Sequence, residues 1–167
     1  MAARYDMTSN IPSSAGSSNR LEEHTAIALM NLDRFWPLPC GGWFRLLDYQ
    51  VPLKANQADA RVGKIDLLGV SDRGRLVVVE LKVQAQAGGR SDPPPTALME
   101  GLRYAAIVEA DLEAIASEAH RRFGVKISGE PPIIALLAPR AWWRGWIDTP
   151  AAGAWRARPN ELSAMPQ

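Results

Sequence analysis

A chain of 167 residues, 47% of them hydrophobic, has the length and composition of one folded domain with a sizeable core. Its formal net charge of +1 excludes a protein-wide basic field, so any attraction to nucleic acid must come from local patches. One cysteine excludes an internal disulfide framework, and with only two histidines a zinc site or a Cys–His nucleophile is poorly supported. Because no apolar run reaches the ~18–20 residues of a membrane span and no hydrophobic signal region opens the chain, we expect a cytoplasmic protein.

Three regions are expected along the chain. Residues 1–18 are polar, with a Pro-Ser-Ser-Ala-Gly-Ser-Ser run, and predict a flexible N-terminal arm. Residues 19–140 are expected to form the core domain. Residues 141–167 carry tryptophans among arginines and predict a C-terminal extension that packs on the core or in a dimer interface. A stacking platform for single-stranded nucleic acid is the alternative for this extension.

The first predicted element is a helix over about 20–35, ended by Pro37. Glu22 lies at the edge of the apolar stripe of this helix and Glu23 points roughly opposite, so Glu22 is the acid expected to face the rest of the domain. The alternative is that both acids only complement the helix dipole. The stripe expected to be buried comprises Leu21, Thr25, Ala28, Leu29, Leu32 and Trp36.

Three strands are predicted next. Residues 43–51 alternate in polarity and are expected to form the first strand. Residues 63–70 and 76–83 are rich in valine, isoleucine and leucine and flank the turn sequence Asp72-Arg73-Gly74. Together they predict an antiparallel hairpin.

The register of this hairpin brings two carboxylates together. If Val70 pairs with Leu76 across the turn, Asp66 lies directly opposite Glu80, whereas a slip of one residue would put Asp66 on the wrong face. Because side chains alternate along a strand, Glu80 shares its face with Lys82. The opposite face is wholly apolar and is predicted to be core: Val77, Val79, Leu81 and Val83.

Two carboxylates facing each other repel unless a cation lies between them. Asp66 and Glu80, with several coordination positions left open, suit Mg²⁺ or Mn²⁺. Lys82 would then orient an attacking water or stabilise developing negative charge. The alternative is a surface hairpin with solvated charges, in which Glu80 and Lys82 form an ion pair worth about 0–1 kcal/mol.

Residues 84–95 leave directly from this proposed site and combine paired glycines with three prolines. The segment predicts either a loop over a bound strand, with Gln84 and Arg90 near phosphates, or a simple connector.

A long helix is predicted from an N-cap at Thr96 to about Phe123, ended by Gly124. The continuous apolar run over 133–138 then predicts a central strand covered on both faces. The buried stripe expected on the helix comprises Leu98, Leu102, Ala105, Leu112, Ile115 and Ala119.

The sequence Gly63-Lys64-Ile65-Asp66-Leu67-Leu68-Gly69, followed by Val78-Val79-Glu80-Leu81-Lys82, resembles the PD-(D/E)XK nuclease superfamily. The closest similarity is to its NucS-type endonuclease domain. The resemblance covers about residues 20–138 in order of elements, and residues 63–83 match closely. It implies an α/β fold with a mixed central β-sheet flanked by helices, in an α-β-β-β-α-β restriction-endonuclease-like core. The activity it implies is metal-dependent hydrolysis of phosphodiester bonds.

The resemblance also implies roles for individual residues. Asp66, Glu80 and the Leu81 carbonyl would be ligands of Mg²⁺ or Mn²⁺, and Lys82 would be the catalytic lysine. The family carries a further acid on the first helix, for which Glu22 is the candidate.

On the helix after the hairpin, the family usually carries a glutamine four residues before a tyrosine. Tyr104 matches the tyrosine, but Glu100 stands at the glutamine position and exchanges a neutral donor for a negative charge. Glu100 would then add a metal ligand or alter how the DNA backbone is held. The alternative is a solvated Glu100 paired with Arg103.

These patterns predict a metal-dependent nuclease whose partner is nucleic acid, with DNA favoured and no membrane. Cutting both strands of a duplex with one such site would favour a homodimer. Two other hypotheses are a catalytically silent nucleic-acid-binding or assembly module with the same fold and a subunit that cuts only inside a larger complex.

Overall fold

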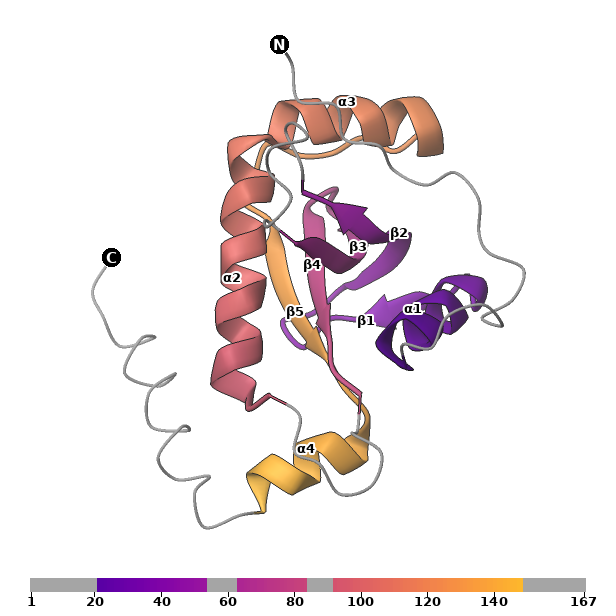
Figure 1. Cartoon of the computed structure of the whole chain (residues 1–167). Coiled ribbons are helices and arrows are strands. Elements are labelled where there is room, and N and C mark those ends of the chain that lie inside the picture. Colours follow the sequence, from indigo (N-terminus) through magenta and orange to yellow (C-terminus); the bar gives the residue numbers. More distant parts are fainter. Residues whose placement is uncertain (1–20, 54–62, 84–91, 149–167) are drawn as a thin grey trace.

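The computed structural model describes residues 21–53, 63–83 and 92–148. Within these residues a five-stranded mixed sheet curls into a half-barrel, and four helices pack against it (Figure 1). The strands lie in the order of the chain; the first four are antiparallel and the fifth is parallel to the fourth. This confirms the predicted α/β class with a mixed sheet. The strands are β1 (Phe35–Pro37), β2 (Trp43–Pro52), β3 (Lys64–Ser71), β4 (Leu76–Leu81) and β5 (Ile133–Leu137).

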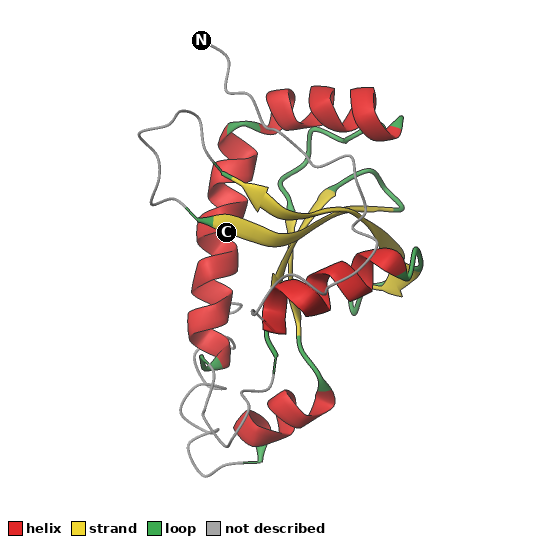
Figure 2. Ribbon diagram, turned by 45° about the vertical axis from the view of Figure 1, so that its right-hand side comes forward, coloured by secondary structure: helices red, strands yellow, loops and turns green. Residues whose placement is uncertain are grey.

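The helices cover both faces of the sheet, as the turned view in Figure 2 makes plain. The helices are α1 (Leu21–Asn31), α2 (Pro94–Ala110), α3 (Leu112–Phe123) and α4 (Arg140–Ile147). One core cluster joins α2 and α3 to one face through Val78, Val108 and Ile115. A second cluster joins α1 to the other face through Ala26 and Val79.

The β3–β4 hairpin has the predicted register. Val70 pairs with Leu76, and the pairing continues to Leu67 and Val79. Gly74 adopts a φ of 79° in the turn, which a glycine does without steric cost. All six residues of β4 are buried, because helices cover this strand on both faces. The prediction that the face of Val77, Val79 and Leu81 is core is confirmed, and Val78 and Glu80 on the other face are buried as well.

The first predicted helix was too long, and its buried stripe was wrong. The helix ends at Asn31, Asp33 adopts a positive φ of 40°, and residues 35–37 form the edge strand β1. Leu21 and Leu32 are 42% and 55% exposed, and the residues packed inward are Ala26, Ile27 and Met30. Apolar residues occur on several sides of this helix, so packing against the sheet decides which side is buried.

The long helix predicted over 96–123 is two helices. α2 begins at Pro94 with Pro93 at its N-cap, so the predicted cap at Thr96 was wrong. At Asp111 the backbone leaves helical geometry, its N–H donates to the Ile107 carbonyl, and α3 starts at the next residue. The predicted end at Gly124 is confirmed by its left-handed φ of 65°.

The buried face of α2 also differs from the predicted stripe. Leu102 is 42% exposed, while the smaller Ala97 and Gly101 lie against the sheet together with Tyr104. Small residues allow the helix axis to approach the strands closely. This close approach brings the polar residues of α2 within reach of the end of β4.

After β5 the chain forms α4, which lies at the foot of the molecule in Figure 1, beyond the ends of β5 and α2. Trp142 is 4% exposed and meets Trp143 edge to face, with ring centroids 4.8 Å apart. Within the described segments, no helix combines the length and apolarity needed to cross a membrane. The N-terminal arm, Gln84, Arg90 and the extension after Asp148 fall outside the described residues.

Gly101→Ala is expected to destabilise the protein by roughly 1–3 kcal/mol. A Cβ at this position would lie 2.8 Å from Ile134 Cγ2, a contact too short for carbon atoms. The clash opposes the gain of about 1 kcal/mol that alanine offers over glycine inside a helix. Urea denaturation measures the balance.

Ile134→Ala supplies the control, because it removes the atom that the new methyl group would meet. In the Ile134→Ala background, Gly101→Ala should cost nothing or stabilise the protein. Equal destabilisation in both backgrounds would contradict a close approach at Gly101.

Candidate active site

Asp66 and Glu80 face each other where β3 and β4 part. The paired register stops at Leu67 and Val79; continued by one step it would set Asp66 opposite Glu80, and the two carboxyls interact electrostatically. Leu81 N–H donates to Asp66 Oδ2 at 2.9 Å, so a β3 side chain serves as partner for the β4 backbone. The N–H and C=O of one strand residue point to the same side, and the Leu81 carbonyl therefore faces the Asp66 side as well.

Lys82 is the centre of an ion-pair network at the end of β4. Its Nζ lies 2.8 Å from Glu80 Oε1, 3.0 Å from Glu100 Oε2 and 3.6 Å from Asp92 Oδ2. Only 7% of the Lys82 side chain and 5% of the Glu80 side chain are exposed. This burial contradicts the alternative of a hairpin with solvated charges. Removing such charges from water costs several kcal/mol per ion unless they are paired, as they are here.

The pKa values of the three groups in this network are shifted in different ways. Burial raises the pKa of the Glu80 carboxyl to about 8, against the opposing effect of the hydrogen bond from Lys82. Burial acts to lower the pKa of Lys82, but hydrogen bonds to Glu80 and Glu100 outweigh it and raise the pKa. Burial acts to raise the pKa of Glu100, yet the bond from Lys82 prevails and lowers it. Lys82 and Glu100 therefore form the firm ion pair, and Glu80 is the member whose charge depends on what binds nearby.

Asp66 belongs to the same electrostatic group. Burial raises the pKa of this carboxyl, and the Leu81 N–H and the Lys82 charge act to lower it. Asp66 also acts to raise the pKa of Glu80, as two carboxylates on facing strands must. Any additional positive charge would therefore stabilise the ionised carboxylates of this site.

Glu22, at the start of α1, completes the acidic surroundings. Burial raises the pKa of Glu22, which is lowered by Lys82 and raised further by Asp66, Asp92 and Glu100. Glu23, one residue on, acts instead on Tyr49. Glu22 therefore belongs to the same electrostatic group as Asp66 and Lys82.

Gln50 on β2 is a member of the site that the sequence did not predict. Its Nε2 donates to Asp66 Oδ1 at 3.3 Å. Its backbone has a φ of 48°, which is uncommon for a residue with a side chain and often accompanies functional sites. It follows a bulge in β2 between Leu46 and Asp48. A bulge cannot be read from the alternating sequence, so no sequence signal marked Gln50, and none marked Asp92.

The remaining predicted residues have different places. Glu100 pairs with Lys82, not with Arg103 as the solvated alternative required. Tyr104 lies one turn further along α2, 8% exposed within the core, and its hydroxyl accepts a hydrogen bond from Arg103 at 3.0 Å. A Cβ on Gly63 would lie 2.8 Å from that hydroxyl, so Tyr104 packs beside the start of β3.

The donor set fits a hard cation that brings most of its own ligands. No three His, Cys, Asp or Glu side chains in the described segments are arranged to hold a metal ion. Two carboxylates do face each other, however, and the buried Glu80 Oε2 has no hydrogen-bond partner. Asp66, Glu80 and the Leu81 carbonyl would supply the few oxygen ligands that Mg²⁺ takes from protein, with water and substrate completing the shell.

No family model, no curated protein and no solved structure matches this chain. The functional argument therefore rests on the geometry of the Asp66–Glu80–Lys82 site.

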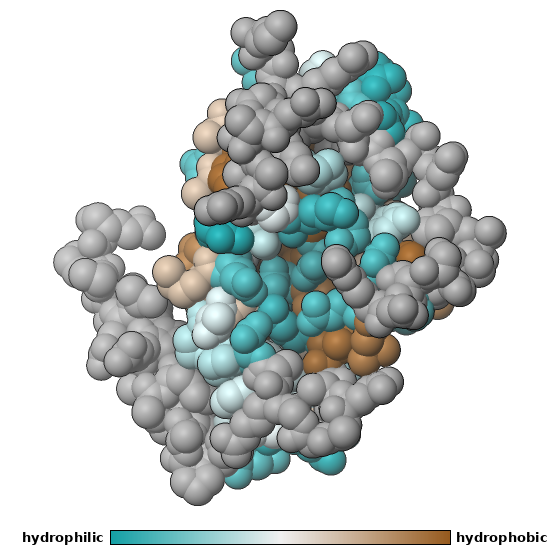
Figure 3. Space-filling view, in the orientation of Figure 1, coloured by the Kyte–Doolittle hydropathy of each residue, from teal (hydrophilic) through white to brown (hydrophobic). Residues whose placement is uncertain are grey.

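Seen from the side of α1 and α2, the surface between these helices is mainly hydrophilic (Figure 3).

In metal-free protein, Glu80→Gln is expected to gain stability over the wild type as pH rises. The pKa of Glu80 is raised on folding from 4.5 to about 8, so its contribution to stability is complete below pH 4.5 and is lost as the pH rises through 8. The difference in unfolding free energy should grow across this window by a few kcal/mol and level off above it. Urea unfolding in EDTA at a series of pH values measures this difference.

Glu118→Gln is the matched control with the opposite sign. The hydrogen bond from Arg121, aided by Arg122 and opposed by burial, lowers the pKa of Glu118. Its contribution to stability is present above pH 4.5 and is lost as the pH falls through the lowered pKa. A pH-independent difference between Glu80→Gln and wild type would contradict the assignment of Glu80 as a buried acid.

Proposed function

We propose that this protein is a metal-dependent nuclease that hydrolyses phosphodiester bonds, with DNA as its substrate. The observation that carries the proposal is the meeting of Asp66, Glu80 and Lys82 at the parting ends of β3 and β4, with Glu80 Oε2 buried and unpartnered. Two carboxylates and a lysine at one site are the groups that this chemistry requires.

The order of the elements supports the proposal. Helix α1, strands β2, β3 and β4, helix α2 and strand β5 follow one another as in the α-β-β-β-α-β core implied by the sequence resemblance. Strand β1 and helices α3 and α4 are additions to that order. The resemblance favours DNA as the substrate, and a homodimer would let one site per subunit cut both strands of a duplex.

Each residue of the site has a part in the proposed reaction. Asp66, Glu80 and the Leu81 carbonyl would hold Mg²⁺ or Mn²⁺, which when bound neutralises charge on the scissile phosphate and lowers the pKa of a water. Lys82 keeps a positive charge at the site, where it orients the attacking water or stabilises the charge that develops on phosphate oxygen. Hydrolysis joins the water oxygen to phosphorus and breaks one P–O ester bond.

Glu100 and Glu22 act around this centre. Glu100 holds Lys82 in place through the 3.0 Å ion pair and keeps it protonated. Glu22 adds negative charge that favours the cation. Together with Asp92, these acids outnumber the one lysine, so the site has an excess of negative charge that a bound cation would offset.

A second candidate function has an observation of its own. Lys82 lies between Glu80 and Glu100 at hydrogen-bond distance from both, and such a network also stabilises a fold without turnover. A catalytically silent nuclease-fold module that binds nucleic acid or assembles with partners would retain this network. The two functions differ in whether DNA is cut.

Cleavage is tested with single-stranded, flapped and duplex DNA in Mn²⁺ or Mg²⁺. Asp66→Asn removes one negative charge from the metal site and Lys82→Met removes the lysine charge, so each should lower the cleavage rate by about a hundredfold or more. Calorimetric titration should also record a loss of Mn²⁺ affinity in Asp66→Asn. Thermal unfolding establishes that the compared variants are folded.

Glu118→Gln is the control, because it changes the same charge type at a surface ion pair on α3. Its cleavage should match that of the wild type. DNA that is bound by the wild type but not cut under any of these conditions would favour the silent module. Cleavage that is equal in the wild type, Asp66→Asn and Lys82→Met would exclude this site as the active site.

Gln50→Gly is expected to separate activity from stability. Glycine accepts the φ of 48° without strain, so stability should be kept, while loss of the amide leaves Asp66 less well oriented and should reduce cleavage by about 10–100-fold. Asp33→Gly relieves the other positive φ of a non-glycine residue in the described chain and should leave cleavage unchanged. Equal activity of Gln50→Gly and wild type would remove Gln50 from the site.

A further inference from the structure

The outward face of the β1–β2 hairpin carries two exposed aromatic rings. Phe35 is 60% exposed and Trp43 is 40% exposed, and their ring centroids lie 4.3 Å apart in an edge-to-face arrangement. The alternate residues Trp36 and Phe44 pair with each other and turn inward to the core cluster beneath α1. Trp36 and Phe44 therefore are the aromatic side chains that the hairpin contributes to the core, and Phe35 and Trp43 lie outside it.

Two cations border these rings. Arg45 lies directly opposite Phe35 in the β1–β2 register and two residues from Trp43, so it shares their outward face. Lys126, exposed beyond the end of α3, closes the other side. A hollow of about 300 Å³ lies among them, and Asp72, whose carboxylate lies against Gly42, is the acid in its lining.

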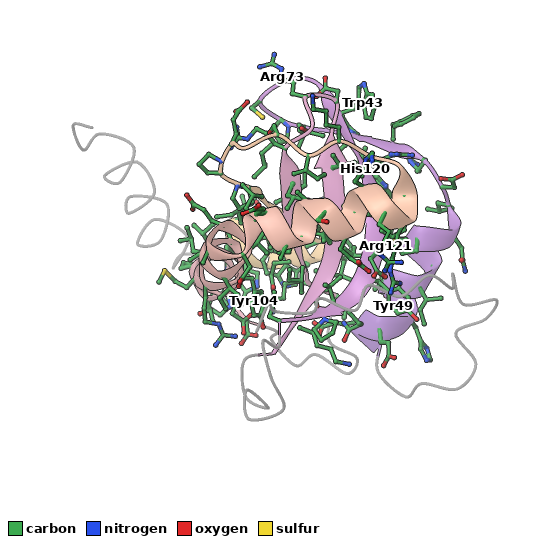
Figure 4. All side chains as sticks on the ribbon, turned by 90° about the horizontal axis from the view of Figure 1, so that it is seen from above. Trp43, Tyr49, Arg73, Tyr104, His120 and Arg121 are labelled. Atoms are coloured by element: carbon green, nitrogen blue, oxygen red, sulfur yellow. The ribbon has the colours of Figure 1, made fainter. Side chains whose placement is uncertain are left out.

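The hollow lies at the opposite end of the β3–β4 hairpin from the acidic site. Val70 and Gly74, beside the turn, line it, whereas Asp66 and Glu80 lie at the open end. Val70 is four residues from Asp66, or about 13 Å along β3. From above the molecule, Trp43 and Arg73 appear on the side opposite Tyr104 (Figure 4).

We propose that this face binds single-stranded nucleic acid, with bases stacked on Trp43 and Phe35 and phosphates bound by Arg45 and Lys126. Exposed rings bordered by cations are the combination by which proteins hold single strands without reading sequence. The inference deepens the proposed function by naming a substrate with a single-stranded segment. Only the purpose of the binding, delivery of DNA to the nuclease site, rests on the proposed function.

The surface is less suited to a protein partner. A stable protein interface buries about 800 Å² on each side, far more than two rings offer. Addition of a strand to the edge is also limited, because β1 has three residues and Pro37 provides no N–H. The combined positive charge of Arg45 and Lys126 beside stacked rings matches a polyanion of bases and phosphates.

The test measures the Kd of a labelled fifteen-nucleotide oligothymidylate for the full chain by fluorescence anisotropy. EDTA is present, so that binding is measured without cleavage. Trp43→Ala and Phe35→Ala should each raise Kd at least about fivefold, equivalent to about 1 kcal/mol. Leu102→Ala, an exposed apolar change on α2, should leave Kd unchanged. Thermal unfolding checks that each variant is folded.

The charge contacts are tested by salt dependence. Arg45→Gln should weaken binding and reduce the slope of log K against log salt by about 0.7, the value of one phosphate contact on a single strand. Arg144→Gln removes the same charge from exposed α4 and should leave the slope unchanged. Equal effects of the two arginine changes would overturn the proposal.

Unchanged oligothymidylate binding in Trp43→Ala and Phe35→Ala would also overturn it. A change of sedimentation coefficient in those variants without a change in Kd would assign the face to a second copy of the chain instead. Oligonucleotide binding that depends on Trp43 in a protein that cuts no DNA would keep this inference and remove the proposed nuclease. Cleavage that depends on Asp66 but not on Trp43, with unchanged oligothymidylate binding, would do the reverse.

Discussion

A buried lysine held by two carboxylates links the sheet to the helix beside it. The Lys82 side chain is 7% exposed, and it is stable there because Glu80 comes from its own strand and Glu100 from α2. Removing the Glu100 carboxylate would leave the buried Lys82 charge with Glu80, whose pKa is raised to about 8, as its main remaining partner, at a cost of several kcal/mol. The position of the helix and the chemistry of the site therefore depend on the same pair of contacts.

The close packing at Gly101 is what makes this linkage geometrically available. Because the residue after Glu100 has no side chain, α2 can lie against Ile134 of β5 and bring the Glu100 carboxylate to Lys82. A bulkier residue would hold the helix away from the strands. The contact between Gly101 and Ile134, which involves no charged group, thus determines how the charged site is built.

The hairpin also separates charges that the composition averages out. A formal net charge of +1 indicates no partner, yet Asp66, Glu80 and Glu22 gather at one end of the β3–β4 hairpin. Arg45 and Lys126 lie with two exposed rings at the other end. Such segregation is what the proposed cation site and the proposed polyanion-binding face would require of one small domain.

Much of the local structure could be predicted because the signals are local. Two apolar runs and the turn around Gly74 predicted the pairing of Val70 with Leu76, from which the opposition of Asp66 and Glu80 follows. The buried face of α1 and the division of the long helix at Asp111 could not be predicted in this way. Apolar residues surround α1 on several sides, and a helix break depends on how each half packs.

By itself, therefore, the sequence determined strands β2, β3 and β4, the turn and the register that pairs the acids, since the two-residue period of a strand carries that information. It missed β1, and its prediction of a central strand over 133–138 was wrong, because β5 forms an edge of the described sheet and is half-buried. Only the tertiary structure decided that Lys82 is buried and that Glu100 is its partner. It also decided that Gln50 reaches Asp66 from a strained backbone. These contacts join elements distant in the chain, and their geometry depends on the packing of helices on the sheet rather than on any local pattern.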